Sequence, residues 1–470
     1  MRRTVYVLLI LSSVSAALFM VSCGSGTNST MSPTAVNLSI SDPATCGAPS
    51  GQFSHVFVTI TDVMIHQSAS AGPNDPGWVD LTPSLKSAPV QTDLLGLATN
   101  QCFLAMLGST GIQPGTFQQI RVILADNAAT VEGNKCGSTV NCVMLTSDTT
   151  QTPQPLLLSS ESKTGIKIPS GQIAGGQFTI AAGQTKDLNV DFNACASIVQ
   201  EGNGQFRLKP VLHAGEVSTT SASINGTVLD GATNQPVAGG IGVAALEQKD
   251  ANGVDRVIME TLVGANGSFV FCPVPAGTYD VVISAINSAG TVYAATVITG
   301  VQPGNALGKV PLTAAGAPAV VSGLITSSTG SAGTVADIEL SALQPITVNG
   351  ANLMITTPLA KQSEATAALA TAAGASCPAN TDCVSYALSV PAANPSVGAF
   401  NTTGTQTPAP PAGEAVNYTM DANAFVPGSA GTIDCTQPNR QTSQTIGATP
   451  LVMTAGTPVT AATLLFTGCQ

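Results

Sequence analysis

The sequence predicts an all-β protein of three consecutive β-sandwich domains, of the immunoglobulin-like or transthyretin-like kind, behind a signal peptide. Short apolar runs with period-two alternation recur along the 470 residues, and turn residues separate them. One phrase, a turn followed by an alternating run, occurs twice, as PGTFQQIRV at residues 114–122 and PAGTYDVVI at residues 275–283. We expect each copy to begin a strand at the edge of a sandwich. The chain is too long for one ordinary core, and its composition changes at residues 218–223 and 314–319, which predicts three domains.

Residues 1–22 predict an export signal. Two arginines precede an apolar run at residues 5–11, and serines then interrupt the run before it reaches the length of a membrane span. Ser22 followed by Cys23 is similar to the lipobox of bacterial lipoproteins, in which the cysteine takes a diacylglycerol and becomes the mature N-terminus. An ordinary cleaved signal that happens to contain a cysteine is the alternative.

A lipid on Cys23 determines where we expect the protein to reside. Residues 23–35 include a stretch rich in Ser, Thr and Gly and would form a lipidated, flexible tether. Several acyl chains anchor a protein more firmly than one. Gly24 occupies the position at which an aspartate is associated with inner-membrane retention. We therefore expect an outer-membrane lipoprotein of the cell envelope that faces an extracytoplasmic compartment.

The charge balance argues against nucleic acid as a partner. Removal of residues 1–22 would leave 13 basic and 26 acidic residues, a formal net charge of −13 at pH 7. No second apolar run reaches the roughly 18 residues that a helix needs to cross a bilayer. We therefore expect contact with the membrane through the N-terminal lipid alone.

Ten cysteines follow Cys23, and an even number in an exported chain favours disulfides. Zinc is the alternative for two close pairs, but five residues separate the members of each pair and no histidine is near. The spacing predicts three bridges: Cys136–Cys142, Cys377–Cys383 and Cys435–Cys469. The connectivity of the other four cysteines stays open: Cys46, Cys102, Cys195 and Cys272.

Four alternating runs predict strands in the first domain, residues 36–217. They are HVFVTIT at 55–61, QIRVIL at 119–124, LNVDF at 188–192 and FRLKPVL at 206–212. The GNG at 202–204 supplies the positive backbone angles of a tight hairpin. Residues 93–98 are a short helical or turn segment.

Phrases of this first domain recur in a fixed order. They are VFVTITDV at 56–63, GWVDL at 77–81, PGTFQQIR at 114–121, TGIKIP at 164–169 and RLKPV at 207–211. In this order they resemble the bacterial lipoprotein domain of unknown function 4382. The resemblance implies an exported β-sandwich and brings no established activity.

The second domain covers residues 221–313. Its phrases are INGTVLD at 224–230, QPVAGGIGV at 235–243, NGSFVF at 266–271 and the second copy of the turn-and-strand phrase. Asn266 and Gly267 predict a hairpin. These phrases resemble the carboxypeptidase regulatory-like domain, a small transthyretin-type sandwich that accompanies other domains without itself being catalytic. Some related sandwiches carry a Lys–Asn crosslink, but the first strand here has no lysine, so none is expected.

The third domain, residues 318–470, resembles no family that we recognise. Alternating runs predict strands at 336–343, 384–390 and 461–466. Residues 365–373 suit a helix by propensity and a strand by the spacing of their threonines, and we expect a strand.

Few residues form a pattern that predicts chemistry. The histidines, His55, His66 and His213, are too dispersed for a metal centre. No metalloprotease or phosphate-loop motif occurs, and Ser331 and Ser429 lack the spacing of a nucleophile elbow. We therefore expect no catalytic residue, no metal and no cofactor.

Three weaker patterns each have two interpretations. The DANGVD loop at 250–255 offers oxygen ligands for calcium, but Asn-Gly there also suits a hairpin, which we favour. Lysines 163, 167 and 209 with aspartates 187 and 191 form either a ligand-binding cluster or exposed ion pairs. Trp78, the only tryptophan, either stacks on a sugar ring or packs at a strand start.

Together these features predict a lipid-anchored envelope protein that acts as a non-catalytic binding, adhesion or structural module. The alternative is a carbohydrate-binding accessory protein or an enzyme subunit of polysaccharide handling, with sugar held at Trp78. The expected partners are the membrane, and a polysaccharide or another envelope protein.

Overall fold

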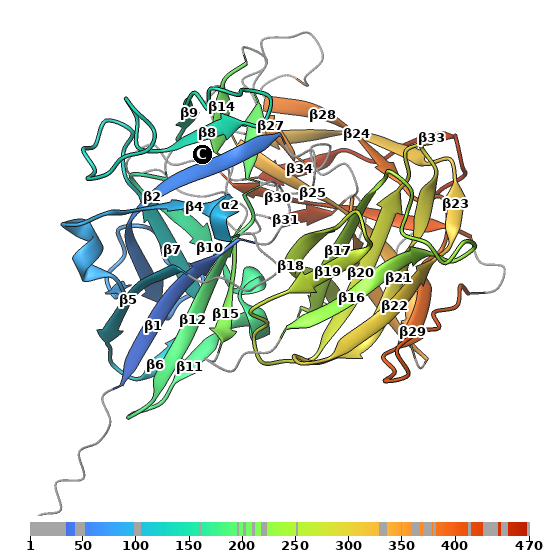
Figure 1. Ribbon diagram of the computed structural model, residues 1–470, viewed down its shortest axis with the longest axis horizontal. Helices are drawn as coiled ribbons and strands as arrows, with labels where there is room; N and C mark the ends of the chain where they lie inside the picture. The colour runs from blue at the N-terminus through green and yellow to red at the C-terminus, as the bar shows by residue number, and fades with distance from the viewer. Residues whose placement is uncertain are drawn as a thin grey trace, which may run out of the picture.

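β-prone alternation dominates the sequence, and the computed structural model is accordingly built almost wholly of strands (Figure 1). The structure describes residues 34–42, 52–97, 105–158, 161–194, 197–200, 204–208, 212–217, 223–250, 252–328, 336–348, 350–359, 366–369, 378, 382–411, 415–425, 440–442 and 450–467. The helical elements among them are the short α2 (Leu94–Leu97) and the 3-10 turns η1 (Pro83–Lys86), η2 (Ser170–Gln172) and η3 (Ala174–Gly176). The prediction of an all-β protein is confirmed.

The first unit is a sandwich of two large sheets. A four-stranded sheet has the order β15 (Leu212–Val217), β12 (Thr185–Phe192), β1 (Ala35–Ser41) and β5 (Ala105–Gly111). The path of the nine-stranded sheet is β10 (Ile166–Ile168), β7 (Gln119–Leu124), β2 (Phe53–His66), β8 (Cys142–Leu145), β9 (Gln154–Leu157), β14 (Phe206–Leu208) and β13 (Ile198–Gln200). β3 (Val79–Asp80) and β4 (Val90–Asp93) also pair with β2, while β6 (Gly115–Phe117) pairs with β11 (Phe178–Ile180).

Alternation along the strands of the first unit fills the space between its two sheets. Leu38 and Ile40 of β1 pair with Leu188 and Val190 of β12, and all four side chains are buried. They belong to one core with buried residues of β2 and β7 from the other sheet. This packing is what a β-sandwich requires of an alternating sequence.

The middle unit has a second, separate core. A three-stranded sheet of β19 (Ser268–Phe271), β16 (Ile224–Asp230) and β22 (Ala306–Leu312) forms one layer. The facing strands are β17 (Ile241–Lys249), β18 (Val254–Val263), β20 (Tyr279–Ile286), β21 (Val292–Val301) and β23 (Ala314–Gly316). Buried residues of both layers, among them Val228, Phe271 and Ile283, form one core.

The last unit has a third core. Its one layer contains β24 (Ala319–Ser328), β28 (Asp382–Val390), β33 (Pro458–Thr460) and β34 (Leu464–Thr467). The other strands are β25 (Ala336–Val348), β26 (Ala351–Thr357), β27 (Thr366–Leu369), β29 (Ser396–Ala399), β30 (Asn417–Phe425), β31 (Arg440–Thr442) and β32 (Leu451–Val452). Buried side chains of the two layers, including Leu388, Tyr418 and Phe466, form the core.

The middle and last units share one sheet. Its path runs β23, β21, β20, β17, β18, β26, β25, β30 and β31 across both units, and β29 pairs with β21. The crossing point is a short parallel pairing of β18 with β26, in which Val254 and Asp255 face Met354 and Ile355. The composition change at residues 314–319 therefore lies within β23 and at the start of β24, and pairing continues around it.

Two local predictions need correction. The first copy of the repeated turn-and-strand phrase begins β6, which pairs with β11 alone, and continues into β7. The second copy leads into β20, and β7 and β20 both have neighbours on each side, so neither of these two is an edge strand. Their nearly continuous burial suits an interior position. Asn266 and Gly267 do form a tight turn, but it links β18 to β19, which lie in different sheets. The turn is thus a corner between layers and not a hairpin.

Other local predictions are confirmed. Residues 94–97 are helical, and the DANGVD loop joins the antiparallel pair β17 and β18. β27 is a strand over Thr366–Leu369, and β25, β28 and β34 lie at the three runs expected in the third domain. β13 and β14 pair antiparallel around a loop in which Gly204 has a φ of +85°.

Candidate functional site

Most of the predicted cysteine sites lie outside the described residues. They are Cys23, Cys46, Cys102, Cys195, Cys377, Cys435 and Cys469. Cys272 and Cys383 are described and are disulfide-bonded. Cys136 and Cys142 form the expected short-loop bridge, with an S–S distance of 2.03 Å.

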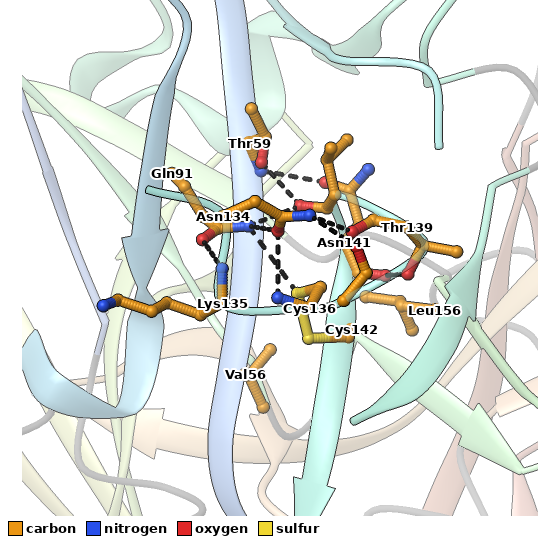
Figure 2. Close-up of a disulfide and its surroundings, with 12 residues drawn as sticks. Val56, Thr59, Gln91, Asn134, Lys135, Cys136, Thr139, Asn141, Cys142 and Leu156 are labelled. Carbon is orange, nitrogen blue, oxygen red and sulfur yellow. Dashed lines mark hydrogen bonds between the residues drawn. A yellow bond between two sulfur atoms is a disulfide. The ribbon is translucent and has the colours of Figure 1, made fainter. Parts of the chain in front are cut away.

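The Cys136–Cys142 loop is held by carboxamide side chains as well as by the disulfide (Figure 2). Asn134 accepts a hydrogen bond from the Cys136 N–H at 2.9 Å and donates to the Thr139 carbonyl at 2.8 Å. Gln91 of β4 donates to Asn134 Oδ1 at 2.9 Å and accepts from the Lys135 N–H at 2.8 Å. These contacts satisfy backbone groups that an irregular loop leaves unpaired.

Asn141 joins this loop to the sheet (Figure 2). Its side chain is completely buried, and its Oδ1 accepts from the Thr59 N–H of β2 at 2.8 Å. Its Nδ2 donates to the Ala125 carbonyl at 3.0 Å and to Asn127 Oδ1 at 2.9 Å. We interpret this network as structural, because every polar atom of the Asn141 carboxamide forms hydrogen bonds within the protein.

Trp78 is half-buried beside β2 and β7. Its indole N–H donates to the Gly72 carbonyl at 2.9 Å. The Arg121 guanidinium lies 5.1 Å from the ring centroid, and the His66 ring lies 5.0 Å away, centroid to centroid. These contacts employ the N–H and much of the ring within the protein, so a role of Trp78 in sugar stacking stays a prediction.

The three histidines occupy different surroundings. His55 Nδ1 lies 2.7 Å from Asp93 Oδ2, whereas His66 accepts from the Ser68 N–H at 2.8 Å. His213 lies on β15 opposite Asp191 of β12. Over the described ranges, no three His, Cys, Asp or Glu side chains come together in an arrangement that could hold a metal ion.

The predicted lysine and aspartate cluster is spread over two sheets. Asp187 and Asp191 lie on β12, where they accept from Asn37 and Ser41, both at 2.7 Å. Lys167 lies on β10 of the other sheet, and Lys209 is outside the described residues. Burial raises the pKa of Asp191 to about 7, although the Ser41 hydroxyl partly opposes this rise.

The DANGVD loop links β17 to β18, and the Asp250 side chain is engaged within the protein. Asp250 Oδ1 accepts from the N–H groups of Asn252 and Val254, at 2.8 and 3.0 Å. Its Oδ2 accepts from Arg256 Nε at 3.1 Å. The side chain of Arg256 therefore supplies the positive charge that this carboxylate faces.

Buried charged groups gather at the junction, by which we mean the contact of the middle and last units around β18 and β26. Arg256 Nη1 donates to Asp421 Oδ2 of β30 at 2.5 Å, and the two side chains are only 10% and 1% exposed. The Thr356 N–H donates to Glu247 Oε2 at 3.1 Å, and the Thr356 hydroxyl donates to the Asp255 carbonyl at 2.7 Å. An apolar cluster from both units, including Val297 and Ile355, lies beside these polar contacts.

Three carboxyl groups near the junction have raised pKa values. Burial, and next the Asp255 carboxylate, raise the pKa of Glu247 well above its usual range. Burial, and next the charge of Asp280, raise the pKa of Asp255 to about 7. Burial likewise raises the pKa of Asp280. These are desolvated acids in a strand contact, and their neighbours are other strands and not a cleft.

A groove lies at a second place where the middle and last units meet. It has a volume of about 340 Å³ and lies among β21, β29, the β25–β26 turn and the segment before β30. Its polar lining consists of carboxamides and hydroxyls: Thr299, Thr347, Asn352, Asn394 and Asn417. Its apolar lining combines aliphatic side chains with four prolines: Pro345, Pro395, Pro410 and Pro411. We call it the junction groove.

Sequence reasoning missed the junction groove and the buried ion pair. Their residues come from positions roughly fifty to 165 apart along the chain, and no local motif marks them. The one feature of the sequence that could have pointed to the groove is the Pro-rich stretch at residues 408–411. Which strand that stretch would lie against depends on sheet pairing, which periodicity does not specify.

Comparison with protein families supports the first domain. Residues 33–210 match the family described as a domain of unknown function, DUF4382. The first domain thus matches the family that the sequence phrases suggested, over nearly the same residues. The resemblance of residues 221–313 to the carboxypeptidase regulatory-like domain stays a prediction. No curated protein matches the chain.

Solved structures give only distant similarity. The TIE protein of Bacillus anthracis is 9% identical, with a TM-score of 0.16, over 93% of this chain and 51% of that one. The chain thus spans about half the length of that protein. A putative adhesin of Bacteroides ovatus is 9% identical, with a TM-score of 0.17, over 51% of this chain and 89% of that one. A streptococcal ancillary pilin is 9% identical, with a TM-score of 0.14, over 92% and 99%. At these TM-scores we draw nothing about function from the three proteins.

Proposed function

We propose that this chain is a cell-envelope lipoprotein that acts as a non-catalytic binding or structural module. Cys23 would carry the lipid, and the sandwiches would stand outside the cytoplasm behind the tether of residues 23–35. The membrane would be reached through the lipid. Among the described residues, no helix combines the length and the apolar character needed to cross a bilayer.

One observation carries the proposal: the middle and last units are joined into one continuous sheet. Linked domains usually meet through modest contacts and move against one another. Here strand pairing, a buried ion pair and an apolar cluster all cross the contact. A chain with three cores and such a joint can hold a surface at a fixed distance and orientation. A binding or structural module requires this rigidity.

Membrane fractionation of the native host tests the anchor. We expect the natural chain in the outer-membrane fraction and Cys23→Ser in the soluble envelope fraction, because the serine cannot form the thioether to the lipid. Ser22→Ala keeps a small residue before the cysteine and should leave the protein anchored. A natural chain found soluble in the cytoplasm with reduced thiols would contradict the proposal.

Limited proteolysis tests the joined architecture. We expect a protease to leave residues 224–467 as one resistant core, with cuts confined to segments outside the sheets. The reason is that strands of the two units pair within one sheet, which protects the backbone at the contact. Early separation into fragments ending near residue 317 would contradict a rigid module.

A further inference from the structure

The junction groove has the size and shape of a site for a small ligand. Its volume of about 340 Å³ is at the lower end of the range for ligand pockets, which suits one or two sugar-sized units. One wall is the β21–β29 pair, where Thr296–Thr299 lie beside Ser396–Ala399. The opposite wall is the β25–β26 turn, so the groove exists only where the middle and last units meet.

The walls of the groove are fixed by hydrogen bonds. The buried Gln344 side chain donates to the Ala393 carbonyl at 3.1 Å and accepts from the Thr357 hydroxyl at 3.1 Å, which ties the 391–395 segment to β25. Val397 and Ala409 exchange backbone hydrogen bonds at 2.9 and 3.1 Å, which holds the Pro-rich stretch against β29. Proline rings add stiffness. A lining that is already ordered loses little entropy when a ligand binds.

The polar groups of the groove are neutral and partly unused. Among the described residues that line it, none carries a charged side chain. Thr347 donates to Asn352 Oδ1 at 3.2 Å, and the Asn352 amide N–H groups have no hydrogen-bond acceptor among the described residues. No hydrogen bond of the described residues involves the side chain of Asn417 or Thr299. The groove thus presents carboxamide and hydroxyl groups, and each of these groups can both donate and accept hydrogen bonds.

We propose that the junction groove binds a short, neutral oligosaccharide. Adjacent sugar hydroxyls donate and accept at once, and a carboxamide offers the matching donor and acceptor in one plane. Proline rings provide apolar surface for the C–H face of a pyranose. Acidic glycans and charged peptides would lose hydration against the described lining residues, which offer them no counter-ion. This inference rests on the proposed function, because it names the ligand class of the binding module.

Calorimetric titration of the full chain with neutral gluco-, manno- and galacto-oligosaccharides tests the proposal. We expect at least one of them to bind. Asn417→Ala and Asn352→Ala should each weaken that binding by about tenfold, as expected for one lost hydrogen bond to a ligand. Ala399→Trp should abolish binding, because Ala399 is exposed and lines the groove, so an indole there would occupy it.

Matched controls separate this site from others. Asn225→Ala removes an exposed carboxamide of β16, away from the groove, and should bind as the natural chain does. Trp78→Ala should also bind normally. Loss of binding in Trp78→Ala with retention in Ala399→Trp would overturn the groove and favour Trp78. Equal or tighter binding of oligogalacturonate or of a proline-rich peptide would overturn the neutral-sugar assignment.

The outcomes distinguish the two proposals. A correctly anchored, protease-resistant protein that binds none of the neutral oligosaccharides overturns the groove proposal and leaves the proposed function standing. A protein that binds sugar in the groove but lies in the cytoplasm overturns the envelope proposal alone. Chromatography of the oligosaccharides after incubation should show unchanged chain lengths, and shortening would contradict a non-catalytic role.

Discussion

Asn141 shows how one buried carboxamide organises an irregular part of the first unit. It accepts from β2 and donates to two positions of the preceding loop, with no exposed surface. Nothing in the sequence separates this asparagine from the others, because the number of backbone groups it satisfies depends on the fold. The disulfide next to it was predictable, since short spacing and export favour it.

Replacing Asn141 by alanine should destabilise the first unit by about 2 kcal/mol or more, because buried backbone groups lose their partners. Asn74→Ala, an exposed carboxamide, should change the stability by less than about 0.5 kcal/mol. Urea unfolding of both variants with the disulfide intact measures the difference. Equal midpoints for the two variants would show that the Asn141 contacts add nothing.

The buried Glu247 makes the junction sensitive to pH. Its pKa in the folded protein is raised, so the folded state holds a proton that the unfolded state releases once pH exceeds the ordinary value near 4.5. Stability from this group is therefore fully present at low pH and is lost as pH rises through the folded pKa. Asp255, whose pKa is about 7, acts in the same direction between about pH 4 and pH 7.

Glu247→Gln should therefore match the natural chain in stability near pH 4 and exceed it at pH 8, because glutamine keeps an acceptor for the Thr356 N–H without a charge. Asp148→Asn should show the reverse trend. Hydrogen bonds, that from the Thr150 hydroxyl foremost, lower the pKa of Asp148, so its contribution is present above the unfolded pKa and lost in acid. Thermal unfolding of Glu247→Gln from pH 4 to pH 8, and of Asp148→Asn from about pH 2 to about pH 5, gives the two slopes, and slopes of the same sign would refute the assignment.

At the scale of single elements, sequence periodicity identified the strands well but did not identify which strands pair with one another. The runs at residues 336–343 and 384–390 lie in β25 and β28 as expected. We expected the repeated phrase to begin edge strands, yet β7 and β20 are interior. An apolar run marks the start of a strand but does not say whether the strand has one neighbour or two. The Asn266–Gly267 turn was likewise recognised, but local sequence does not say whether a turn stays in one sheet.

Gly267 and Gly253 provide a matched test of turn geometry. Gly267 has a φ of +82°, and a Cβ there would lie 2.4 Å from the Val228 carbonyl oxygen, whereas Gly253 has a φ of +79° with open space around it. Gly253→Ala should cost about 1 kcal/mol for the backbone conformation alone. Gly267→Ala should cost about 3 kcal/mol, because it adds a clash with backbone at the corner between sheets. Denaturant midpoints measure both, and similar costs would mean that the corner relaxes freely.

At the scale of the whole molecule, three separate cores were foreseeable and their connection was not. Length and composition changes indicate several cores, and the structure has one apolar cluster in each unit and a fourth that the middle and last units share. The shared sheet depends on the pairing of β18 with β26 and of β21 with β29, and on charges that meet only in the fold. Contacts between segments this distant leave no periodic signal in a single sequence.

The Arg256–Asp421 pair should couple the unfolding of the middle and last units. Arg256→Leu leaves Asp421 desolvated without its guanidinium, so we expect a loss of about 3 kcal/mol and a separation of one thermal transition into two. Arg256→Leu combined with Asp421→Leu should recover much of the stability, because the uncompensated charge is gone. Lys186→Met removes a more exposed ion pair, with side chains 24% and 41% exposed, and should cost less than about 1 kcal/mol. Scanning calorimetry distinguishes these cases. If Arg256→Leu unfolded in one transition at the natural temperature, the ion pair would contribute nothing to the joint, and its rigidity would have to come from strand pairing and the apolar cluster alone.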